Sequence, residues 1–313
     1  MWTAKSQQMK RLRSKSTLVL VGAVILMTVS IFTSSCSSSN SSANTVVTSF
    51  YPLEYVAREI AGEDFKVVNI TPLGAEPHDL ELTPNSTEQL LDAKLAIVMG
   101  EGFQPAIEKT AKSRDLPTLE ILKEIDSRLS NRDSTNGDPH IWLDPNQMKS
   151  IVEIVTEKLI ETNPKQTETY KKRQEKLSKR LVGLDSEYKA AFKECEIKTF
   201  VTSHDSFSHL ARSYGLKQES IAGLSPENEP DANRLKEISK IVDKENIDVI
   251  FTEEVVSKKV AKVLAKESGV KTEILSPIEG LSEEQQKGDE DYFSLMETNL
   301  KRLSSALRCV PTV

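Results

Sequence analysis

The sequence predicts an α/β fold of two lobes, each a parallel sheet flanked by helices, joined by one long linking helix. Three observations lead to this fold class. Short apolar runs alternate with amphipathic helical stretches, the alternation occurs again in the second half, and a long charged segment separates the halves. About 270 residues follow the N-terminal polar segment, enough for two lobes with a core in each.

The first 35 residues are predicted to be a secretory signal peptide. Basic residues, the last of them Lys15, precede an uncharged and mostly apolar run over residues 17–32. Small residues then lead into Cys36, and a serine-rich tether continues to residue 44. This pattern resembles a bacterial lipoprotein cleavage site and favours lipidation of Cys36. Because Thr33 stands where such sites usually carry leucine, uncleaved anchoring by the apolar run is the alternative.

Both alternatives place the rest of the chain outside the cytoplasm, periplasmic or at the cell surface, and held at a membrane only by its N-terminus. The signal peptide contains five of the 41 basic residues and none of the 47 acidic ones, so the mature part has a net charge of −11. An acidic surface without a basic tract argues against nucleic acid as a partner and leaves cationic ligands open.

The two cysteines of the body, Cys195 and Cys309, form an even pair in an oxidising compartment. One disulfide between them is therefore predicted, tying the C-terminus to the body. Two free buried thiols are the alternative.

The strands are predicted from short apolar runs bounded by turn residues. The N-terminal lobe, residues 45–164, has four such runs, and the C-terminal lobe, residues 196–313, has another four. The predicted strands cover residues 45–50, 66–70, 95–99 and 118–121 in the first lobe, and 198–202, 217–221, 248–252 and 271–274 in the second.

Two consecutive helices are predicted between the lobes, divided at Asn163-Pro164. The first begins at Pro145 and packs on the N-terminal lobe. The second, the linking helix over residues 165–195, is heavily charged with one apolar stripe. Such a helix is either a solvated face or a strut between lobes, and its position midway through a repeated pattern favours the strut. The apolar positions are Met148, Ile151, Ile154, Val155 and Leu159 in the first helix, and Tyr170, Leu177, Leu181, Leu184 and Tyr188 in the second.

Three of the four histidines lie in short, turn-rich segments, which suggests a metal site assembled by the fold. His78 and His204 each follow a predicted strand, at the sheet edge where ligands collect. His140 follows a proline. A single histidine is more often structural, so the hypothesis depends on all three together. Two come from the first lobe and one from the second, which predicts a site in the cleft between them.

His209, the fourth histidine, is interpreted as a non-ligand on a helix surface. Five residues of helical rotation turn it away from His204.

Several segments together resemble the zinc and manganese solute-binding proteins of bacterial ATP-binding-cassette importers, a TroA-like superfamily, and within it the zinc-binding ZnuA-like branch. The likeness covers essentially the whole mature chain and includes the signal with Cys36. The other segments are TSFYP at 48–52, PHD at 77–79, DPHIWLDP at 138–145, residues 201–216, GLSPENEP at 223–230 and DYFSLM at 291–296.

The resemblance implies His78, His140 and His204 as metal ligands, with an acidic fourth ligand near the C-terminus. Counting back from the DYFSLM segment places that ligand on Glu290. The neighbouring carboxylates Asp289 and Asp291, or a water, are the alternatives.

The same resemblance implies the kind of metal. A carboxylate at the position of His204 marks the manganese-like branch, whereas a histidine there gives three nitrogens and one acid. Imidazole-rich, four-coordinate sets suit Zn²⁺, while Mn²⁺ prefers more oxygen. Residues 131–137 are short and contain no histidine, unlike the long metal-capturing loop of many zinc-binding members.

The implied function is extracytoplasmic capture of Zn²⁺ and its delivery to the permease of an importer. The protein is expected to be a monomer and not an enzyme, with Zn²⁺ as the transported ligand. One alternative is a carrier of Mn²⁺ or of several divalent metals for the same kind of importer. A zinc hydrolase would need an open coordination position and a general base, and the sequence has no His-Glu-x-x-His motif. A surface adhesion lipoprotein would leave the three histidines unexplained.

Overall fold

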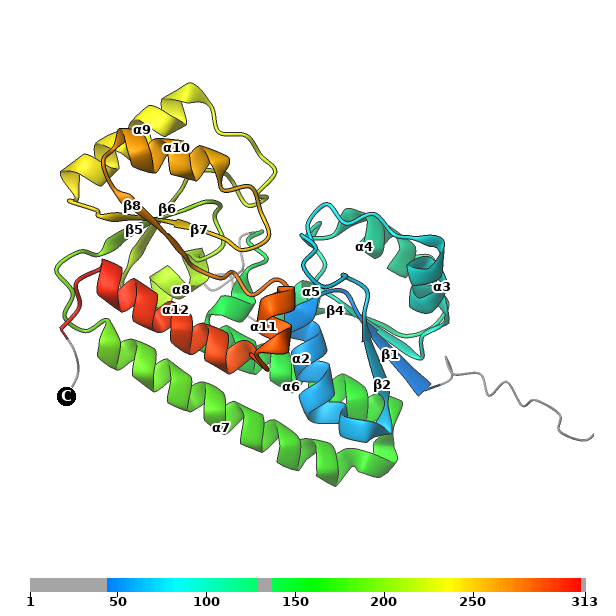
Figure 1. The fold of residues 1–313 in the computed structure, drawn as a ribbon. Helices are drawn as coiled ribbons and strands as arrows, with labels where there is room; N and C mark the ends of the chain where they lie inside the picture. The colour runs from blue at the N-terminus through cyan, green and yellow to red at the C-terminus, as the bar shows by residue number, and fades with distance from the viewer. Residues whose placement is uncertain (1–43, 129–136, 311–313) are drawn as a thin grey trace, which may run out of the picture. The chain divides into compact units, whose positions relative to one another are not determined.

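Each half of the chain contains a four-stranded parallel sheet, which confirms the predicted fold class (Figure 1). The computed structural model describes residues 44–128 and 137–310, which belong to one compact unit. The strands of the first sheet are β1 (Thr45–Thr48), β2 (Lys66–Asn69), β3 (Leu95–Val98) and β4 (Thr118–Glu120). Those of the second are β5 (Thr199–Thr202), β6 (Lys217–Ser220), β7 (Val249–Thr252) and β8 (Lys271–Ile274).

The two sheets have the same strand order, β2-β1-β3-β4 and β6-β5-β7-β8. In each sheet, the connection after the second strand passes over the first strand to reach the third. The first connection and the later ones therefore run in opposite directions across the sheet. Such a switch point leaves a crevice at the carboxyl ends of the strands. The central strands β1, β3, β5 and β7 are buried along their whole length, as expected for parallel strands covered on both faces.

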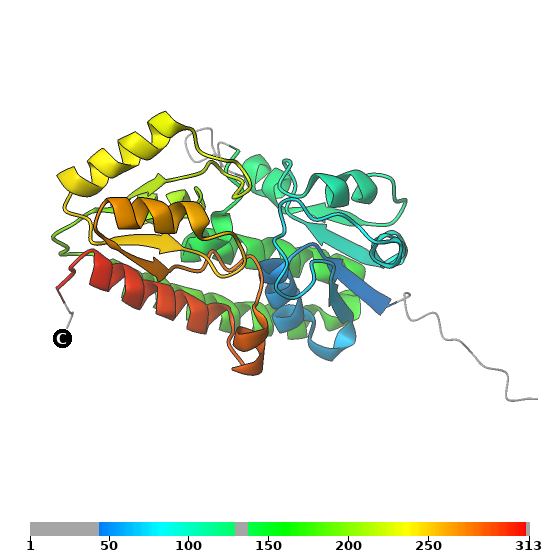
Figure 2. The ribbon, with the colours of Figure 1, turned by 45° about the horizontal axis from the view of Figure 1, so that its top comes forward.

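Helices cover both sheets (Figures 1 and 2). In the first half, α2 packs on β1 and β2, α4 on β3 and α5 on β4; in the second, α8 packs on β6 and α10 on β7 and β8. The bounds are α2 Tyr51–Ala61, α3 Pro84–Asp92, α4 Pro105–Ala111, α5 Ile121–Arg128, α8 Ser208–Ser213, α9 Ala232–Lys244, α10 Lys259–Glu267, α11 Glu283–Lys287 and α12 Tyr292–Ala306.

Prolines and capping side chains set where several helices begin. The helices α2, α3 and α4 carry a proline in their first turn, where the missing N–H costs no helical hydrogen bond. The carboxylates of Asp231 and Asp291 accept backbone N–H groups at the starts of α9 and α12. Asp291 is the neighbour of the predicted ligand Glu290 and one of its alternatives, and its side chain is used in this cap.

The two central helices are α6 (Pro145–Thr162) and α7 (Thr167–Ala191). The short 3₁₀ turn Pro164–Gln166 separates them, so α7 begins slightly later than predicted. All ten predicted apolar positions of the two helices are buried. The 25 residues of α7 span about 37 Å, and the helix packs on α2 and α6 of the first half and on α12 of the second. This packing is that of a strut between the halves.

The predicted disulfide between Cys195 and Cys309 is present, so the alternative of two free thiols is wrong. It joins the segment after α7 to the segment after α12. Main-chain hydrogen bonds flank it, with Ile197 N–H donating to Leu307 O at 3.1 Å and Val310 N–H donating to Glu194 O at 2.8 Å.

The predicted signal peptide, Cys36 and all but the last residue of the tether lie outside the described residues. Within the described part of the chain, no helix combines the length and the apolar character that a membrane crossing requires.

Candidate metal centre

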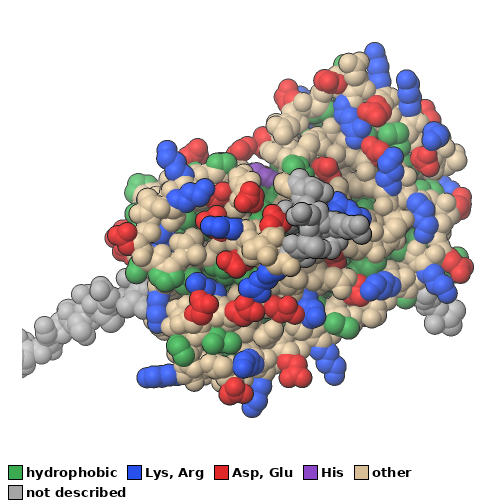
Figure 3. Space-filling model, turned by 180° about the vertical axis from the view of Figure 1, so that it is seen from behind, with side chains coloured by type: hydrophobic (Ala, Val, Ile, Leu, Met, Phe, Trp, Pro, Cys, Tyr) green, Lys and Arg blue, Asp and Glu red, His purple; other side chains and the backbone are tan. Residues whose placement is uncertain are grey.

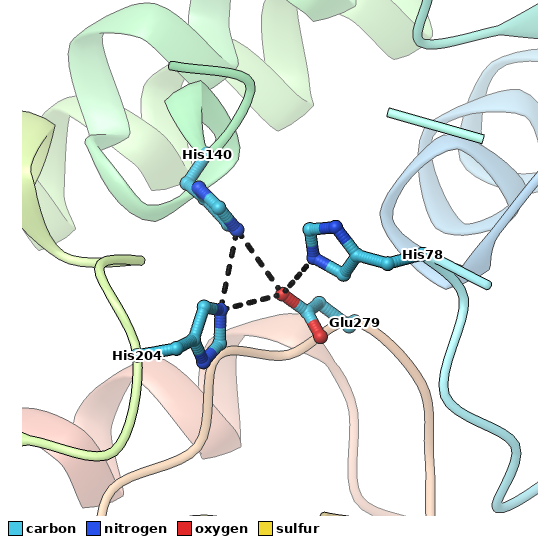
Figure 4. A group of neighbouring side chains, drawn as sticks. All are labelled: His78, His140, His204 and Glu279. Carbon is cyan, nitrogen blue, oxygen red and sulfur yellow. Dashed lines mark hydrogen bonds and ion pairs between the residues drawn. The ribbon is translucent and has the colours of Figure 1, made fainter. Parts of the chain in front are cut away.

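Four buried side chains converge between the two halves: His78, His140, His204 and Glu279 (Figure 4). One ligand atom from each lies within 4.8 Å of all the others. The exposed fraction is 7% for His78, 1% for Glu279 and 0% for the other two. A small patch of histidine surface is visible between the halves in the space-filling view (Figure 3). The group is therefore almost closed to solvent.

Each of the four residues is placed by the end of a strand or the start of a helix. His78 lies in the loop after β2 and His204 in the loop after β5, while Glu279 follows β8. His140 directly precedes the 3₁₀ turn Ile141–Leu143, which leads into α6. The strand-end positions bring His78, His204 and Glu279 together because the carboxyl edges of both parallel sheets face the same crevice, and the turn before α6 adds His140.

Four distances within the group match those between the ligands of a tetrahedral zinc ion. One carboxylate oxygen, Glu279 Oε1, lies 3.3 Å from Nε2 of His78, 3.3 Å from Nε2 of His140 and 3.4 Å from Nε2 of His204. The Nε2 atoms of His140 and His204 are 3.3 Å apart. Ligands of a tetrahedral ion with bonds of about 2.0–2.1 Å are separated by about 3.3–3.4 Å. Four of the six distances therefore fit a four-coordinate ion, and the ligand atoms of His78, His140 and His204 all lie within 4.8 Å of one another.

Two carboxylates outside this group orient the histidine rings. Asp138 Oδ1 lies 2.8 Å from His140 Nδ1, and Glu253 Oε1 lies 2.7 Å from His204 Nδ1. Because an ionised carboxylate only accepts hydrogen bonds, both Nδ1 atoms carry the proton and both Nε2 atoms present a lone pair. Two lone pairs facing each other beside a carboxylate oxygen require a proton or a metal cation between them.

His78 is held differently. Its ring packs edge-on against Phe103, with the ring centroids 4.5 Å apart. Its backbone is fixed by Glu76, whose carboxylate accepts the His78 N–H at 3.0 Å, and by Gln104, whose amide donates to Pro77 O at 3.2 Å. Among the described residues, no carboxylate forms a hydrogen bond with Nδ1 of His78 like those that hold the rings of His140 and His204.

The segment that carries Glu279 is tied to the first half of the chain. The indole N–H of Trp142 donates to Pro277 O at 2.7 Å, and Gly74 N–H donates to Leu281 O at 2.9 Å. Between them, Ile278 adopts a left-handed conformation with φ of 56°. A β-branched residue in this region is strained, so these contacts hold the segment in a conformation that it does not adopt by local preference.

Proton affinities in the group are shifted by its own contacts. Burial alone lowers the pKa of His140, but hydrogen bonds to Asp138 and Glu279 outweigh it and raise that pKa above its ordinary 6.5. Burial also lowers the pKa of His204, but the charges and hydrogen bonds of Glu253 and Glu279 together outweigh it and raise that pKa well above 6.5. For Glu279, burial raises the pKa, yet the hydrogen bonds to the three histidines hold it well below 4.5. Without metal, His140 and His204 therefore hold a proton more tightly than a free histidine does.

These shifts predict how the stability of the metal-free protein depends on pH. A raised histidine pKa stabilises the fold fully below about pH 6.5, and the contribution is lost as pH rises through the folded-state value. The lowered pKa of Glu279 stabilises above about pH 4.5. The group therefore contributes most between pH 4.5 and 6.5. We expect Glu279→Gln to lower the free energy of unfolding more at pH 5.5 than at pH 8.5, by on the order of 1 kcal/mol.

Urea unfolding with a chelator present measures this difference. Glu290→Gln is the matched control, because Glu290 is exposed and lies outside the group. Equal losses at both pH values for Glu279→Gln would contradict the coupling between the carboxylate and the imidazoles.

The assignment of the acidic member to Glu290 is corrected to Glu279. The chain forms the extra helix α11 before the DYFSLM segment, so counting back from Tyr292 stops on the wrong side of it. Glu290 and Asp289 are exposed, and Asp291 caps α12. A usable signal was present in the sequence: Glu279 follows a predicted strand and a proline at position 277, in the same setting as the histidines.

The interpretation of His209 is corrected in part. It lies outside the group of four, but it is only 2% exposed and contacts Asp138 and Gln147, so it is not on a helix surface. Asp138 and Glu253, which orient the rings, were not singled out in the sequence. Glu253 follows β7 directly. It therefore has the same kind of position, at a strand end, that identified His204 in the sequence.

Solved structures with the same fold include metal-binding proteins of streptococci. The Zn(II)-bound ZnuA-like domain of Streptococcus pneumoniae AdcA superposes with a TM-score of 0.71 at 34% identity, covering 84% of this chain and 98% of that chain. The laminin-binding protein Lmb of Streptococcus agalactiae, described as a bifunctional protein with adhesin and metal transporting activity, has a TM-score of 0.76 at 32% identity, covering 84% and 99%.

Curated relatives include zinc-binding proteins of other bacteria. The zinc-binding protein AdcA of Streptococcus pyogenes serotype M1 is 35% identical over 282 residues, which cover 82% of this chain but only 55% of AdcA. The chain thus spans about half the length of that relative. The high-affinity zinc uptake system protein ZnuA of Bacillus subtilis (strain 168) is 34% identical over 277 residues, covering 84% of this chain and 87% of that protein. Residues 46–306 match the family model described as ZnuA, zinc-uptake complex component A, periplasmic, and the chain belongs to this family.

Proposed function

We propose that this protein captures Zn²⁺ outside the cytoplasm and delivers it to the permease of an ATP-binding-cassette importer. The observation that carries the proposal is the buried group of three imidazoles and one carboxylate, in which the carboxylate oxygen lies 3.3–3.4 Å from a nitrogen of each imidazole. The relatives named as zinc-binding and zinc-uptake proteins support the same metal and the same kind of transport. Zn²⁺ is then the cargo of the protein.

The ligand set favours Zn²⁺ over Mn²⁺. Three neutral nitrogens and one carboxylate oxygen match the borderline character and four-coordination of Zn²⁺, whereas Mn²⁺ prefers more oxygen ligands and a larger shell. The neighbouring carboxylates Asp138 and Glu253 are already engaged by Nδ1 atoms of the histidines. They are therefore not free to extend the shell of a bound ion.

The closed set of four protein ligands favours carriage of the ion over hydrolysis. A catalytic zinc site keeps one position open for water and needs a general base beside it. Here four protein ligands close the shell, and the group is almost without solvent exposure. A closed shell suits an ion that is bound tightly and transferred.

Titration of the metal-free protein with Zn²⁺ and with Mn²⁺ tests the proposal. We expect one tightly bound Zn²⁺ per chain in a competition assay with a chelator, and binding of Mn²⁺ that is weaker by about tenfold or more. A stoichiometry other than one, or tighter binding of Mn²⁺ than of Zn²⁺, would refute the function proposed here.

A matched pair of variants tests the acidic ligand. Glu279→Gln is expected to weaken Zn²⁺ binding by about tenfold or more, because the amide removes the negative charge that attracts the dication. Glu290→Gln makes the same chemical change on an exposed residue and is expected to leave the affinity unchanged. The reverse ranking in the competition assay would restore Glu290 as the ligand.

Membrane attachment and the partner complete the proposal. The signal-like N-terminus and Cys36 support a lipid anchor, and AdcA of Streptococcus pneumoniae is named a zinc-binding lipoprotein. The body then acts as a monomer tethered near the permease, without nucleic acid. If Cys36→Ser left the protein in the membrane fraction, anchoring by the uncleaved apolar run would replace lipidation.

A further inference from the structure

We infer that His209 is a positioning residue of the proposed zinc site, and that it holds the Asp138 carboxylate against the ring of His140. The inference rests on the function proposed above and adds a residue that does not touch the metal. It concerns a histidine that is 2% exposed and belongs to none of the four converging side chains.

The contacts of His209 fix which of its nitrogens carries the proton. The side-chain amide nitrogen of Gln147 lies 3.0 Å from His209 Nδ1. An amide nitrogen only donates, so Nδ1 accepts and the proton of the neutral ring lies on Nε2. From there it is donated to Asp138, whose main-chain oxygen lies 3.1 Å away and whose Oδ2 lies 3.3 Å away.

Asp138 is therefore held between two imidazoles. Its Oδ1 accepts from the main-chain N–H of His140 at 3.0 Å and from the ring Nδ1 at 2.8 Å. Its Oδ2 is buried and forms no well-aligned hydrogen bond, so the ring of His209 is the polar group that faces it. Without that ring, a buried carboxylate oxygen and a buried carbonyl would lose their neighbour, which costs free energy unless the side chain turns away.

His209 also links the two halves of the chain at the site. It lies on α8, which begins four residues after His204, whereas Asp138 and Gln147 flank His140 in the other half. The chain of contacts thus runs from α8 through Asp138 to His140. The second carboxylate oxygens of Asp138 and Glu253 both lack a hydrogen-bond partner among the described residues, but that of Asp138 has the ring nitrogen of His209 at 3.3 Å.

The expected consequence is a metal site that is less well oriented when His209 is lost. Groups that hold the second nitrogen of a ligating histidine fix its tautomer, and their loss typically weakens metal binding 10- to 100-fold. We expect His209→Leu to lower the affinity for Zn²⁺ by about tenfold, toward the lower end of this range because Asp138 itself remains. His209→Gln can present an amide N–H near the position of Nε2 and is expected to stay within about threefold of the wild type.

A second contact of the same helix with the segment around His140 provides the control. Ser213, also on α8, donates a hydrogen bond of 2.6 Å to Asp144, four residues after His140, but it has no connection to a ligand ring. Ser213→Ala therefore tests general loosening between α8 and this segment. In an Asp138→Asn background, His209→Leu is expected to have little further effect, because the residue acts through the carboxylate.

The experiment is a competition titration of Zn²⁺ on these variants, together with the ¹⁵N shifts of histidine in the metal-free wild type. The NMR measurement requires no substitution and is expected to show His140 protonated on Nδ1 and His209 on Nε2. The opposite tautomer of His209 would overturn the inference. So would equal losses for His209→Leu and Ser213→Ala, or wild-type affinity in His209→Leu. Failure of the wild type to bind Zn²⁺ would instead remove the proposed function, and this role with it.

Discussion

Replacing His140 with alanine is expected to weaken Zn²⁺ binding by about 100- to 1,000-fold. Four-ligand zinc sites in proteins are stabilised by roughly 10–16 kcal/mol, so one ligand contributes about 3–4 kcal/mol. His140 is a proposed ligand whose surroundings are fixed on two sides, with Asp138 on Nδ1 and Trp142 behind the ring at a centroid distance of 5.2 Å. A competition titration with a chelator of known affinity measures the change.

His78→Ala is the matched comparison for this variant. The ring of His78 packs on Phe103, and its backbone is fixed by neighbouring side chains. Because a carboxylate on the second nitrogen raises the basicity of a ligand, we expect the loss at His78 to be smaller than at His140. An affinity of His140→Ala within threefold of the wild type would exclude His140 as a ligand. The unfolding of each metal-free variant shows whether the fold is retained.

Removal of the disulfide is expected to lower the free energy of unfolding by about 2–4 kcal/mol. The bridge between Cys195 and Cys309 closes a loop with a sequence separation of 114 residues. Restricting so long a loop reduces the entropy of the unfolded chain, which stabilises the folded state by comparison. Urea unfolding of the double variant Cys195→Ser/Cys309→Ser, without metal, measures the difference.

The zinc stoichiometry of this variant serves as the control. The main-chain hydrogen bonds beside the bridge and the ion pairs of Arg308 with Glu196 and Asp248 remain after the substitution. We therefore expect the fold and one Zn²⁺ per chain to persist. A loss below about 1 kcal/mol would show that these contacts, and not the covalent bond, hold the C-terminus. Chemical reduction of the wild type should give the same loss as the double variant.

The periodic elements were the part of the fold that local sequence predicted best. Apolar runs such as residues 95–98 form strands because their side chains are buried on both faces of a parallel sheet. The stripe from Tyr170 to Tyr188 identified the long helix in the same way. The start of α7 was predicted too early because a 3₁₀ turn at Pro164 precedes it. A proline is compatible with the start of a 3₁₀ turn and with the start of an α-helix, so it does not distinguish them.

The members of the site were harder to predict where their positions depend on the path of the loops that connect helices and strands. His78 and His204 stood out because each follows a strand, and such positions converge at a sheet edge. Glu290 was chosen by its distance from a resembling segment, and the helix α11 made that distance misleading. His209 was placed on a surface from its rotation relative to His204, since the partners that bury it, Asp138 and Gln147, are more than sixty residues away in the sequence.

By itself, the sequence determined the two-lobed α/β architecture, the disulfide and the three histidines that converge. These follow from local periodicity, from an even pair of cysteines, and from residues at strand ends. Only the tertiary structure decided that Glu279 is the acidic member of the group, that Asp138 and Glu253 contact its histidine rings, and that His209 contacts Asp138. The physical reason is that a metal site is defined by distances of about 3 Å between side chains, and loops of undetermined path separate those side chains in the sequence.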